Sequence, residues 1–398
     1  MTASWDVLVV GGGATGAGVL RDLAMRGVRA LLIDKGDFGS GTSGRYHGVL
    51  HSGGRYVASE PVTARECSRE NEVLRRIAAS AIEDTGGFYV ITPDDAEDFV
   101  DVFQAGCLAS EVDCESVDPA WLVAREPALN PRISRVFRAP DASLDPWRLI
   151  EANIAAARQL GSEALSYREL IGLERIGDRI TAARVVDVRS RLAERIPVGF
   201  VVSAAGAWAG QVAALAGATL RMSPGKGTMI VFERMTDRII CRCRQAADGD
   251  AMVPIGPVSI FGTTDVQVSD PDDLDVQAGD VDRLLDLGEM LFPDLRRMRF
   301  VRAYAGVRPL YDYGEDHRRG SRDITRSHAV VDHALGDGIA NFISIVGGKL
   351  TTYRLMAEDT VDVVARKLGI GTPCATADTP LPDPPARRYP SFATGPAT

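Results

Sequence analysis

Lysine is scarce in this sequence of 398 residues. Only Lys35, Lys226, Lys349 and Lys367 occur among the 45 lysine and arginine residues, so the other 41 are arginine. Acidic residues are more numerous still, and the formal net charge is −9 at pH 7. Because such a surface is repelled by nucleic acid, we expect no nucleic-acid partner. An anionic substrate would need a local cluster of arginines.

Cysteine motifs are also absent. The six cysteines form no CxxC pair and no paired metal-ligand spacing, so the sequence predicts no metal site. No apolar leader segment of the secretory type opens the sequence. We therefore expect reduced thiols in a cytoplasmic protein.

Long apolar runs are rare, and only residues 198–220 are long and uncharged enough to resemble a membrane span. They contain four glycines, and half of their apolar residues are alanine. A β-branched start followed by alanine favours a buried strand, a turn at Gly206 and a helix. We therefore expect no spanning helix and, at most, peripheral contact with a membrane.

A dinucleotide-binding pattern lies near the start of the chain. Residues 5–34 read as a buried strand, a glycine-rich turn, a helix and a second strand, which is the βαβ unit of an α/β fold. Gly11, Gly13 and Gly16 form GxGxxG in the turn, and Asp34 ends the second strand. Such glycines let the backbone approach a pyrophosphate, and the acid can bind a ribose hydroxyl. NAD and FAD both fit this pattern.

Later segments favour FAD. The glycines and small hydroxylated residues after Asp34 would let the backbone come close to the pyrophosphate and the flavin at a second place. Near the other end, a buried strand enters a Gly-Gly turn and a helix begins, and its N–H groups could stabilise negative charge on a reduced flavin. The expected cofactor contacts in these segments are Thr42, Ser43, Gly44, Gly206, Gly347, Gly348, Leu350 and Thr351, with Lys349 as a nearby cation.

The middle of the chain has a different pattern. Short strands separated by turn residues over 226–265 predict an antiparallel sheet. We therefore expect a Rossmann-like FAD-binding domain joined to a second domain built on that sheet. The predicted ranges are 1–85, 140–218 and 330–372 for the FAD-binding domain, 86–139 and 219–329 for the substrate or cap domain, and 373–398 for a disordered tail. The tail holds seven of the 21 prolines.

Residues 45–56, RYHGVLHSGGRY, concentrate chemistry in one loop. They hold two of the five histidines. His51 could accept an alcohol proton while hydride leaves for flavin, and His47 could pack against the flavin. Arg matches phosphate bidentately, so convergent cations would make an anion site. The candidates for it are Arg55, Arg308, Arg326 and Lys349.

Several segments together resemble a known family. They are GGGATGAG, HGxLHSGxRY, RCR, FGTTD, AYAGVRPL, ITRSHAVVDH and GGKLTTYRLMAE. In this order they are similar to the FAD-dependent glycerol-3-phosphate dehydrogenases, and most of all to the large catalytic subunit of the anaerobic type. The similarity extends from residue 5 to about residue 380.

This resemblance implies a reaction and roles. It implies oxidation of sn-glycerol 3-phosphate to dihydroxyacetone phosphate by hydride transfer from C2 to N5 of FAD. Electrons would pass toward a quinone, directly or through partner subunits, at the cytoplasmic face of the inner membrane. By motif position, His51, Arg55 and Tyr56 would face the substrate. Its phosphate would be held, or its C2 polarised, by Arg308, Arg326 and Lys349. Thr263 and Thr264 would line the same cavity.

Other interpretations stay open at this point. An amine or amino-acid oxidase of the same flavoprotein group would need one carboxylate-binding Arg rather than several cations. A flavin-containing protein that only relays electrons would leave His51 and the arginines without roles. The sequence also lacks the cysteine-rich domain of the longer anaerobic proteins, so dioxygen, a soluble dye and a quinone all stand as possible acceptors.

Overall fold

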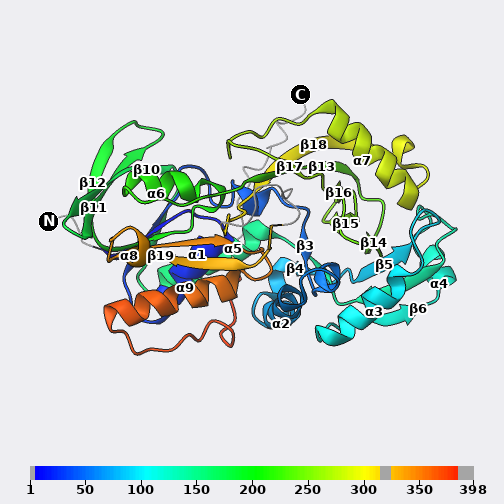
Figure 1. The fold of residues 1–398 in the computed structure, drawn as a ribbon, viewed down its shortest axis with the longest axis horizontal. Coiled ribbons are helices and arrows are strands. Elements are labelled where there is room, and N and C mark those ends of the chain that lie inside the picture. The colour runs from blue at the N-terminus through cyan, green and yellow to red at the C-terminus, as the bar shows by residue number, and fades with distance from the viewer. Residues whose placement is uncertain (1–4, 314–323, 384–398) are drawn as a thin grey trace, which may run out of the picture.

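The computed structural model describes residues 5–313 and 324–383, which form two large sheets with helices around them (Figure 1). The first unit is β1 (Trp5–Val10), α1 (Ala14–Met25) and β2 (Ala30–Ile33). Both strands are parallel and fully or largely buried, as expected for a sheet covered on both faces. The predicted βαβ unit is confirmed.

An eight-stranded sheet is built around this unit. Its strand order is β10-β11-β12-β1-β2-β9, with β20 on β12 and β19 on β20. The pairs β12–β1, β1–β2, β2–β9 and β12–β20 are parallel, whereas the β10–β11–β12 meander is antiparallel. The further strands are β9 (Glu163–Leu165), β10 (Arg168–Ile176), β11 (Arg179–Asp187), β12 (Ala193–Ser203), β19 (His328–Asp332) and β20 (Phe342–Gly347).

Helices cover the two faces of this sheet. On one face, α1 packs against α5 (Pro146–Gln159) and α9 (Tyr353–Leu368) around a core of small and branched apolar residues. On the other face lies α6 (Ala209–Leu215), after the 3₁₀ turn η4 (Gly206–Trp208). Residues 198–220 therefore form strand, turn and helix, as predicted. Among the described residues, no helix is long and apolar enough to cross a membrane.

A nine-stranded sheet forms the second lobe, in the right half of Figure 1. Its order is β17-β13-β16-β15-β14-β5-β7-β6, and β18 also pairs with β13. The predicted antiparallel sheet is confirmed except at β5–β14, which is parallel. These two strands lie far apart in the sequence, and only a long connection allows parallel pairing. The strands are β5 (Gly87–Ile91), β6 (Glu115–Val117), β7 (Arg135–Ala139), β13 (Gly225–Glu233), β14 (Ile239–Arg242), β15 (Ala251–Ile255), β16 (Val258–Gly262), β17 (Val266–Gln267) and β18 (Phe300–Arg308).

Two further cores hold the second sheet to its helices. A small three-stranded sheet has the order β3 (Val49–Leu50), β8 (Ala142–Leu144) and β4 (Ile82–Glu83). The strands of the large sheets come from the ranges predicted for the two domains almost without exception, but the domain boundaries themselves stay a prediction. The remaining α-helices of the described residues are α2 (Pro61–Ile77), α3 (Phe99–Ala109), α4 (Pro119–Val123), α7 (Ala278–Leu291) and α8 (His333–Gly336).

The start of the proline-rich tail is ordered against the first lobe. The backbone N–H of Leu381 donates to the carbonyl of Ile77 at 2.7 Å, and Arg354 Nη1 donates to Thr376 Oγ1 at 3.1 Å. The side chain of Leu381 also packs on the core beside α9. The prediction of disorder is therefore wrong for residues 373–383, because these contacts compensate for the proline content. Residues 384–398 lie outside the described residues.

Candidate active site

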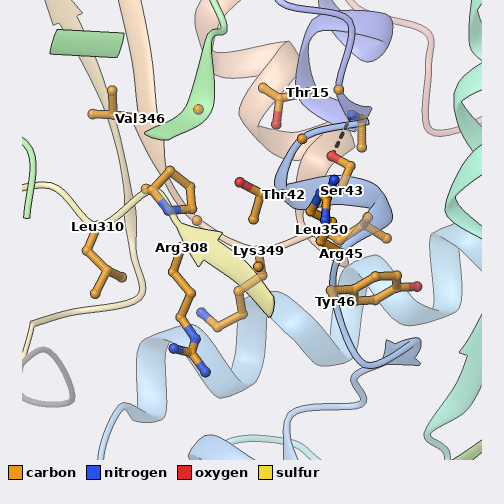
Figure 2. Close-up of a pocket in the computed structure, with 18 of the residues that line it drawn as sticks. Thr15, Thr42, Ser43, Arg45, Tyr46, Arg308, Leu310, Val346, Lys349 and Leu350 are labelled. Carbon is orange, nitrogen blue, oxygen red and sulfur yellow. Dashed lines mark hydrogen bonds between the residues drawn. The ribbon is translucent and has the colours of Figure 1, made fainter. Parts of the chain in front are cut away.

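One large cavity, of about 1710 Å³, is lined by both lobes. The first lobe contributes the turn after β1, the end of β2 and the turn after β20. The second lobe contributes β13 and the end of β18. Figure 2 shows Thr42, Ser43, Arg308 and Lys349 at this cavity, with the Lys349 side chain extending toward Arg308. Segments that are remote in the sequence thus meet in one site.

The glycine turn after β1 packs closely on the segment that follows β12 and leads into α1. Gly11 has a φ of +110°, and a Cβ there would lie 2.5 Å from the carbonyl oxygen of Ala204. Gly13 precedes α1, whose first turn has no side-chain cap. Instead, the N–H of Ala14 donates to Ser43 Oγ at 3.0 Å (Figure 2). A helix end of this kind favours an anion such as a pyrophosphate.

The third glycine of the fingerprint has a packing role. A Cβ on Gly16 would lie 1.8 Å from the carbonyl oxygen of Gly11, so only glycine lets α1 approach β1 here. Gly16 does not line the cavity. Its predicted direct contact with the cofactor is therefore replaced by close packing of helix on strand.

Asp34 lies at the end of β2 and lines the cavity. Its Oδ2 accepts from the N–H of Gly12 at 2.6 Å, and its Oδ1 accepts from the N–H of Gly36 at 2.7 Å. Burial raises the pKa of this carboxyl, and the two N–H groups oppose that shift. The acid is thus held rigidly at the strand end, where a ribose would lie.

In the loop after Asp34, some residues line the cavity and others do not. Thr42 and Ser43 line the cavity, and Thr42 Oγ1 donates to the carbonyl of Val307 at 2.7 Å. Gly44 does not line it: a Cβ there would meet the carbonyl of Gly39 at 2.3 Å and the indole of Trp147 at 2.9 Å. Gly44 therefore allows close packing here, its N–H donates to the carbonyl of Gly41 at 3.3 Å, and its contact with the cofactor stays a prediction.

The closing turn reaches the cavity with the residues that were predicted, but the helix begins later than expected. Gly347 and Gly348 have φ values of +74° and +70°, and both line the cavity. The helix α9 does not begin directly after the two glycines. Four residues in a turn come first, and the helix begins at Tyr353. Lys349, Leu350 and Thr351 in that turn line the cavity, as does Gly206 on the opposite side. The turn, rather than the first N–H groups of the helix, thus faces the site.

These residues fit FAD. A Cβ on Gly13 would lie 3.0 Å from Ser43 Oγ, at the lining of the cavity, so glycine keeps this space open where a helix without a side-chain cap begins. Asp34 supplies the acceptor for a ribose, and the turn after β20 closes the other end. A cavity this large matches an extended dinucleotide with a flavin ring and leaves space for a small substrate.

His51 is buried at the inner end of the cavity, with 7 % of its surface exposed. Its backbone N–H donates to Thr351 Oγ1 at 3.0 Å, and its ring lies 5.4 Å from His47 and 5.3 Å from Tyr56. Within the described part of the chain, His51 Nδ1 has no hydrogen-bond partner. Burial, and then the charges of neighbouring basic groups, hold the pKa of His51 well below its ordinary value. The ring is therefore neutral at pH 7 and can accept a proton.

His47 is also uncharged. Burial lowers its pKa to about 3, and Arg55 and Arg308 contribute to the same shift. Its Nδ1 accepts from the N–H of Val49 at 3.2 Å. His47 lines the cavity, consistent with its predicted place against the flavin.

Three cations converge on the cavity from two lobes. Arg308 and Arg326 share the carboxylate of Asp265, at 2.8 Å and 3.8 Å. Lys349 Nζ donates to the carbonyl of Arg326 at 3.0 Å and lies 4.5 Å from the centre of the Tyr56 ring. Burial lowers the pKa of Arg308 to about 10, so its guanidinium stays charged at neutral pH, and burial also lowers the pKa of Lys349. Such a cluster of partly buried charge suits a phosphate.

The other predicted substrate residues differ in placement. Arg55 lines the cavity and pairs with Asp250 at 3.0 Å. Thr263 lines it as well, and its Oγ1 accepts a hydrogen bond from Arg308. Thr264 does not line it: its Oγ1 faces β13 and accepts from the N–H of Thr228 at 3.0 Å. Successive side chains point in different directions, so only one of the two threonines can face the site.

The sequence interpretation missed the acids that hold these cations. Asp265 directly follows the two threonines of FGTTD, so this motif carried a usable signal. Asp250 and Glu60 stand in no such motif. Glu60 Oε2 accepts from the N–H of Arg326 at 2.8 Å and from Thr325 Oγ1 at 3.1 Å. In residues 5–313 and 324–383, no group of three His, Cys, Asp or Glu side chains could hold a metal ion.

Comparison with known proteins agrees with this geometry. The family model described as "FAD dependent oxidoreductase" matches residues 6–354. A chain of the anaerobic glycerol-3-phosphate dehydrogenase of Escherichia coli K12 is 41% identical over 382 residues, which is 95% of this chain and 70% of that protein. The corresponding protein of Haemophilus influenzae is 39% identical over 382 residues, or 95% of this chain and 68% of that one.

Solved structures share the fold. A glycerol-3-phosphate dehydrogenase from Bacillus halodurans, complexed with FAD, has a TM-score of 0.73 at 24% identity, over 95% of this chain and 68% of that one. A glycine oxidase from Bacillus cereus has a TM-score of 0.74 at 17% identity, over 92% and 96%. The fold alone thus does not separate alcohol from amine oxidation, whereas the sequence identity does. The chain belongs to the FAD-dependent oxidoreductases, and among them to the glycerol-3-phosphate dehydrogenases.

Proposed function

We propose that this chain oxidises sn-glycerol 3-phosphate to dihydroxyacetone phosphate. The observation that carries this proposal is the convergence of Arg308, Arg326 and Lys349 with neutral His51 on one cavity beside the dinucleotide cradle. An amino acid would need one cation for its carboxylate, whereas a phosphate dianion is better matched by several. The sequence relatives named for this substrate support the same choice.

The substrate would be held at its phosphate end. Arg308 and Arg326 are oriented by their shared carboxylate, Asp265, and Lys349 is fixed by the carbonyl of Arg326. Preoriented donors bind a phosphate with a smaller entropy cost, and they place C2 at a fixed distance from the anchor. Thr263 and Tyr56 line the same cavity.

His51 would remove the proton of the C2 hydroxyl. The ring is neutral, buried and without a partner for Nδ1 among the described residues, so it can accept this proton. The nearby charges of Arg55 and Lys349 disfavour a protonated resting state. FAD, when bound, would supply the two-electron acceptor for the hydride that leaves C2.

The cofactor would lie along the first lobe. We assign the dinucleotide to Gly11, Gly13 and Asp34, and the flavin to the region between His47 and the turn of Gly347. Further contacts would come from Thr42, Ser43, Gly206, Gly348, Leu350 and Thr351.

Electrons would leave toward a quinone, either directly or through partner subunits. The sequence relatives are named as one component of a larger enzyme, which supports an assembly with other chains. We place the protein in the cytoplasm, with at most peripheral contact with the inner membrane. The formal charge of −9 opposes direct binding to anionic lipid, so a partner or a small apolar patch would make this contact.

A substrate panel tests the proposal. The purified protein is assayed with a soluble dye against glycerol 3-phosphate, glycerol, glycine, proline and sarcosine. We expect turnover with glycerol 3-phosphate at a kcat/KM at least about a hundredfold above that for any amino acid, because each unmatched buried cation costs transition-state stabilisation. Preferential oxidation of an amino acid would overturn the proposal in favour of an amine oxidase.

A further inference from the structure

A second cavity, of about 470 Å³, lies directly behind the loop that carries His47. Arg45 and His47 line the first cavity, whereas Gly44 and Gly48 line the second. Tyr46 lines both. One layer of chain therefore separates the two cavities, at the place where the flavin ring is assigned.

The second cavity is lined largely by aromatic and aliphatic side chains. Trp147, at the start of α5, is 38 % exposed, and its indole lies against the loop near Gly44. Ile255 and Val258, from the β15–β16 hairpin, line the cavity together with Tyr304 of β18. A cavity of this size and lining accommodates a small planar apolar ring.

Charged groups of both signs also lie at this cavity, and the acidic ones are Glu83 and Asp145. Arg148 and Arg302 line it and are exposed, and the guanidinium of Arg302 lies 5.3 Å from the centre of the Tyr304 ring. Both arginines carry N–H donors that suit the carbonyl oxygens of a planar ring.

The wall between the cavities is held rigidly. The hydroxyl of Tyr46 donates to the carbonyl of Leu144 at 2.6 Å. The hydroxyl of Tyr304 donates to the carbonyl of Tyr46 at 2.7 Å. These bonds fix the Tyr46 ring in place, so a ligand on each side would be kept at a constant and short separation.

We propose that the second cavity binds the ring of a quinone acceptor, and that electrons leave the flavin across the layer of Tyr46. This inference rests on the proposed function. The substrate loses two electrons and two protons when its alcohol becomes a ketone, and the quinone gains two electrons and two protons to become a hydroquinone. The apolar rings contact the quinone ring, and the two arginines donate to its oxygens. The phosphorylated substrate keeps the first cavity, with its three cations.

Filling the second cavity tests this assignment. Val258→Trp would occupy it from β16, and Val62→Trp, on an exposed face of α2, is the matched control. Flavin reduction by glycerol 3-phosphate and re-oxidation by menadione are followed separately by stopped-flow absorbance. We expect the menadione rate to fall roughly tenfold or more in Val258→Trp only, because the ring loses its space.

Two further measurements keep the result interpretable. Arg302→Ala is a surface change that removes one proposed donor, and it should raise the KM for menadione about threefold to tenfold. Excess glycerol 3-phosphate should leave the KM for menadione unchanged in the unmodified protein, since the two ligands occupy different cavities. Unchanged re-oxidation in both variants, or competition between substrate and menadione, would overturn the assignment.

Failure of the proposed function would be seen separately. If glycerol 3-phosphate does not bleach the flavin, the substrate assignment is wrong. Protein reduced with dithionite still reports on the acceptor site, because its re-oxidation by menadione in Val258→Trp and Val62→Trp can be compared directly.

Discussion

The two ends of the main cavity are built from different kinds of contact. At the dinucleotide end, backbone conformation shapes the site: Gly11, Gly13 and Asp34 lie within one βαβ unit, and their partners are mostly main-chain groups. At the substrate end, side-chain charges from distant segments meet, as Arg308 and Arg326 do at Asp265. A site shaped by the backbone should lose binding altogether when one glycine is replaced. A site made by several charged side chains should lose only part of its activity when one of them is removed. The predictions below test that difference.

The largest effect should come from the backbone end. Gly13→Val should abolish FAD binding, because a β-branched side chain would occupy the space assigned to the pyrophosphate. Gly279→Ala, in α7, is the control, since a Cβ there meets nothing within 4 Å. Flavin absorbance per protein after purification measures the result. A Gly13→Val protein that retains stoichiometric FAD would show that the cradle lies elsewhere.

Next in size is the proton acceptor. His51→Asn should lower kcat by about 10²–10⁴-fold, the usual contribution of a positioned general base. FAD content should stay normal, which separates this effect from loss of the cofactor. A loss of less than about threefold would exclude His51 as the base.

The pH profile sharpens the same point. A base works only when deprotonated, and the pKa of His51 is held far below its ordinary value. We therefore expect kcat to stay level as the pH falls from about 8 through about 6.5, where an unperturbed histidine would already be half protonated. A decline in kcat centred near about pH 6.5 would show that the catalytic base is in contact with water.

At the charged end, Arg308→Ala should cost roughly 30- to 1000-fold in kcat/KM for glycerol 3-phosphate, as expected for the loss of a charge-assisted contact in a desolvated site. Free glycerol should lose much less, because it has no phosphate. Arg299→Ala, at an exposed arginine of the same lobe, is the control. Equal losses for both substrates would assign Arg308 a structural role.

The smallest effect should come from the acid that orients the cations. Asp265→Asn keeps the shape of the side chain but removes the charge shared by Arg308 and Arg326. We expect the KM for glycerol 3-phosphate to rise about tenfold with kcat changed less than about threefold, since a residue that acts through the cations mainly preorganises binding. A fall in kcat without a change in KM would indicate that Asp265 acts on the reaction step itself.

The sequence predicted what depends on neighbours in the chain. The βαβ unit, the Gly206 turn and the charged candidates were found because each is marked by a local pattern of glycines or basic residues. The sequence does not reveal what three-dimensional packing decides: Gly16 and Gly44 allow close packing, and Thr264 faces β13. The ordered start of the tail depends on contacts with α2 and α9 that composition does not encode.

An anaerobic titration of the purified protein with glycerol 3-phosphate is the most direct test of the proposed reaction. The visible absorbance of FAD should bleach with one equivalent of substrate, and dihydroxyacetone phosphate should form in the same amount, without any partner chain or added acceptor. Glycine and proline should leave the spectrum unchanged. Persistent yellow colour with glycerol 3-phosphate, or bleaching by an amino acid instead, would contradict the assignment of the three cations and His51 to a phosphorylated alcohol.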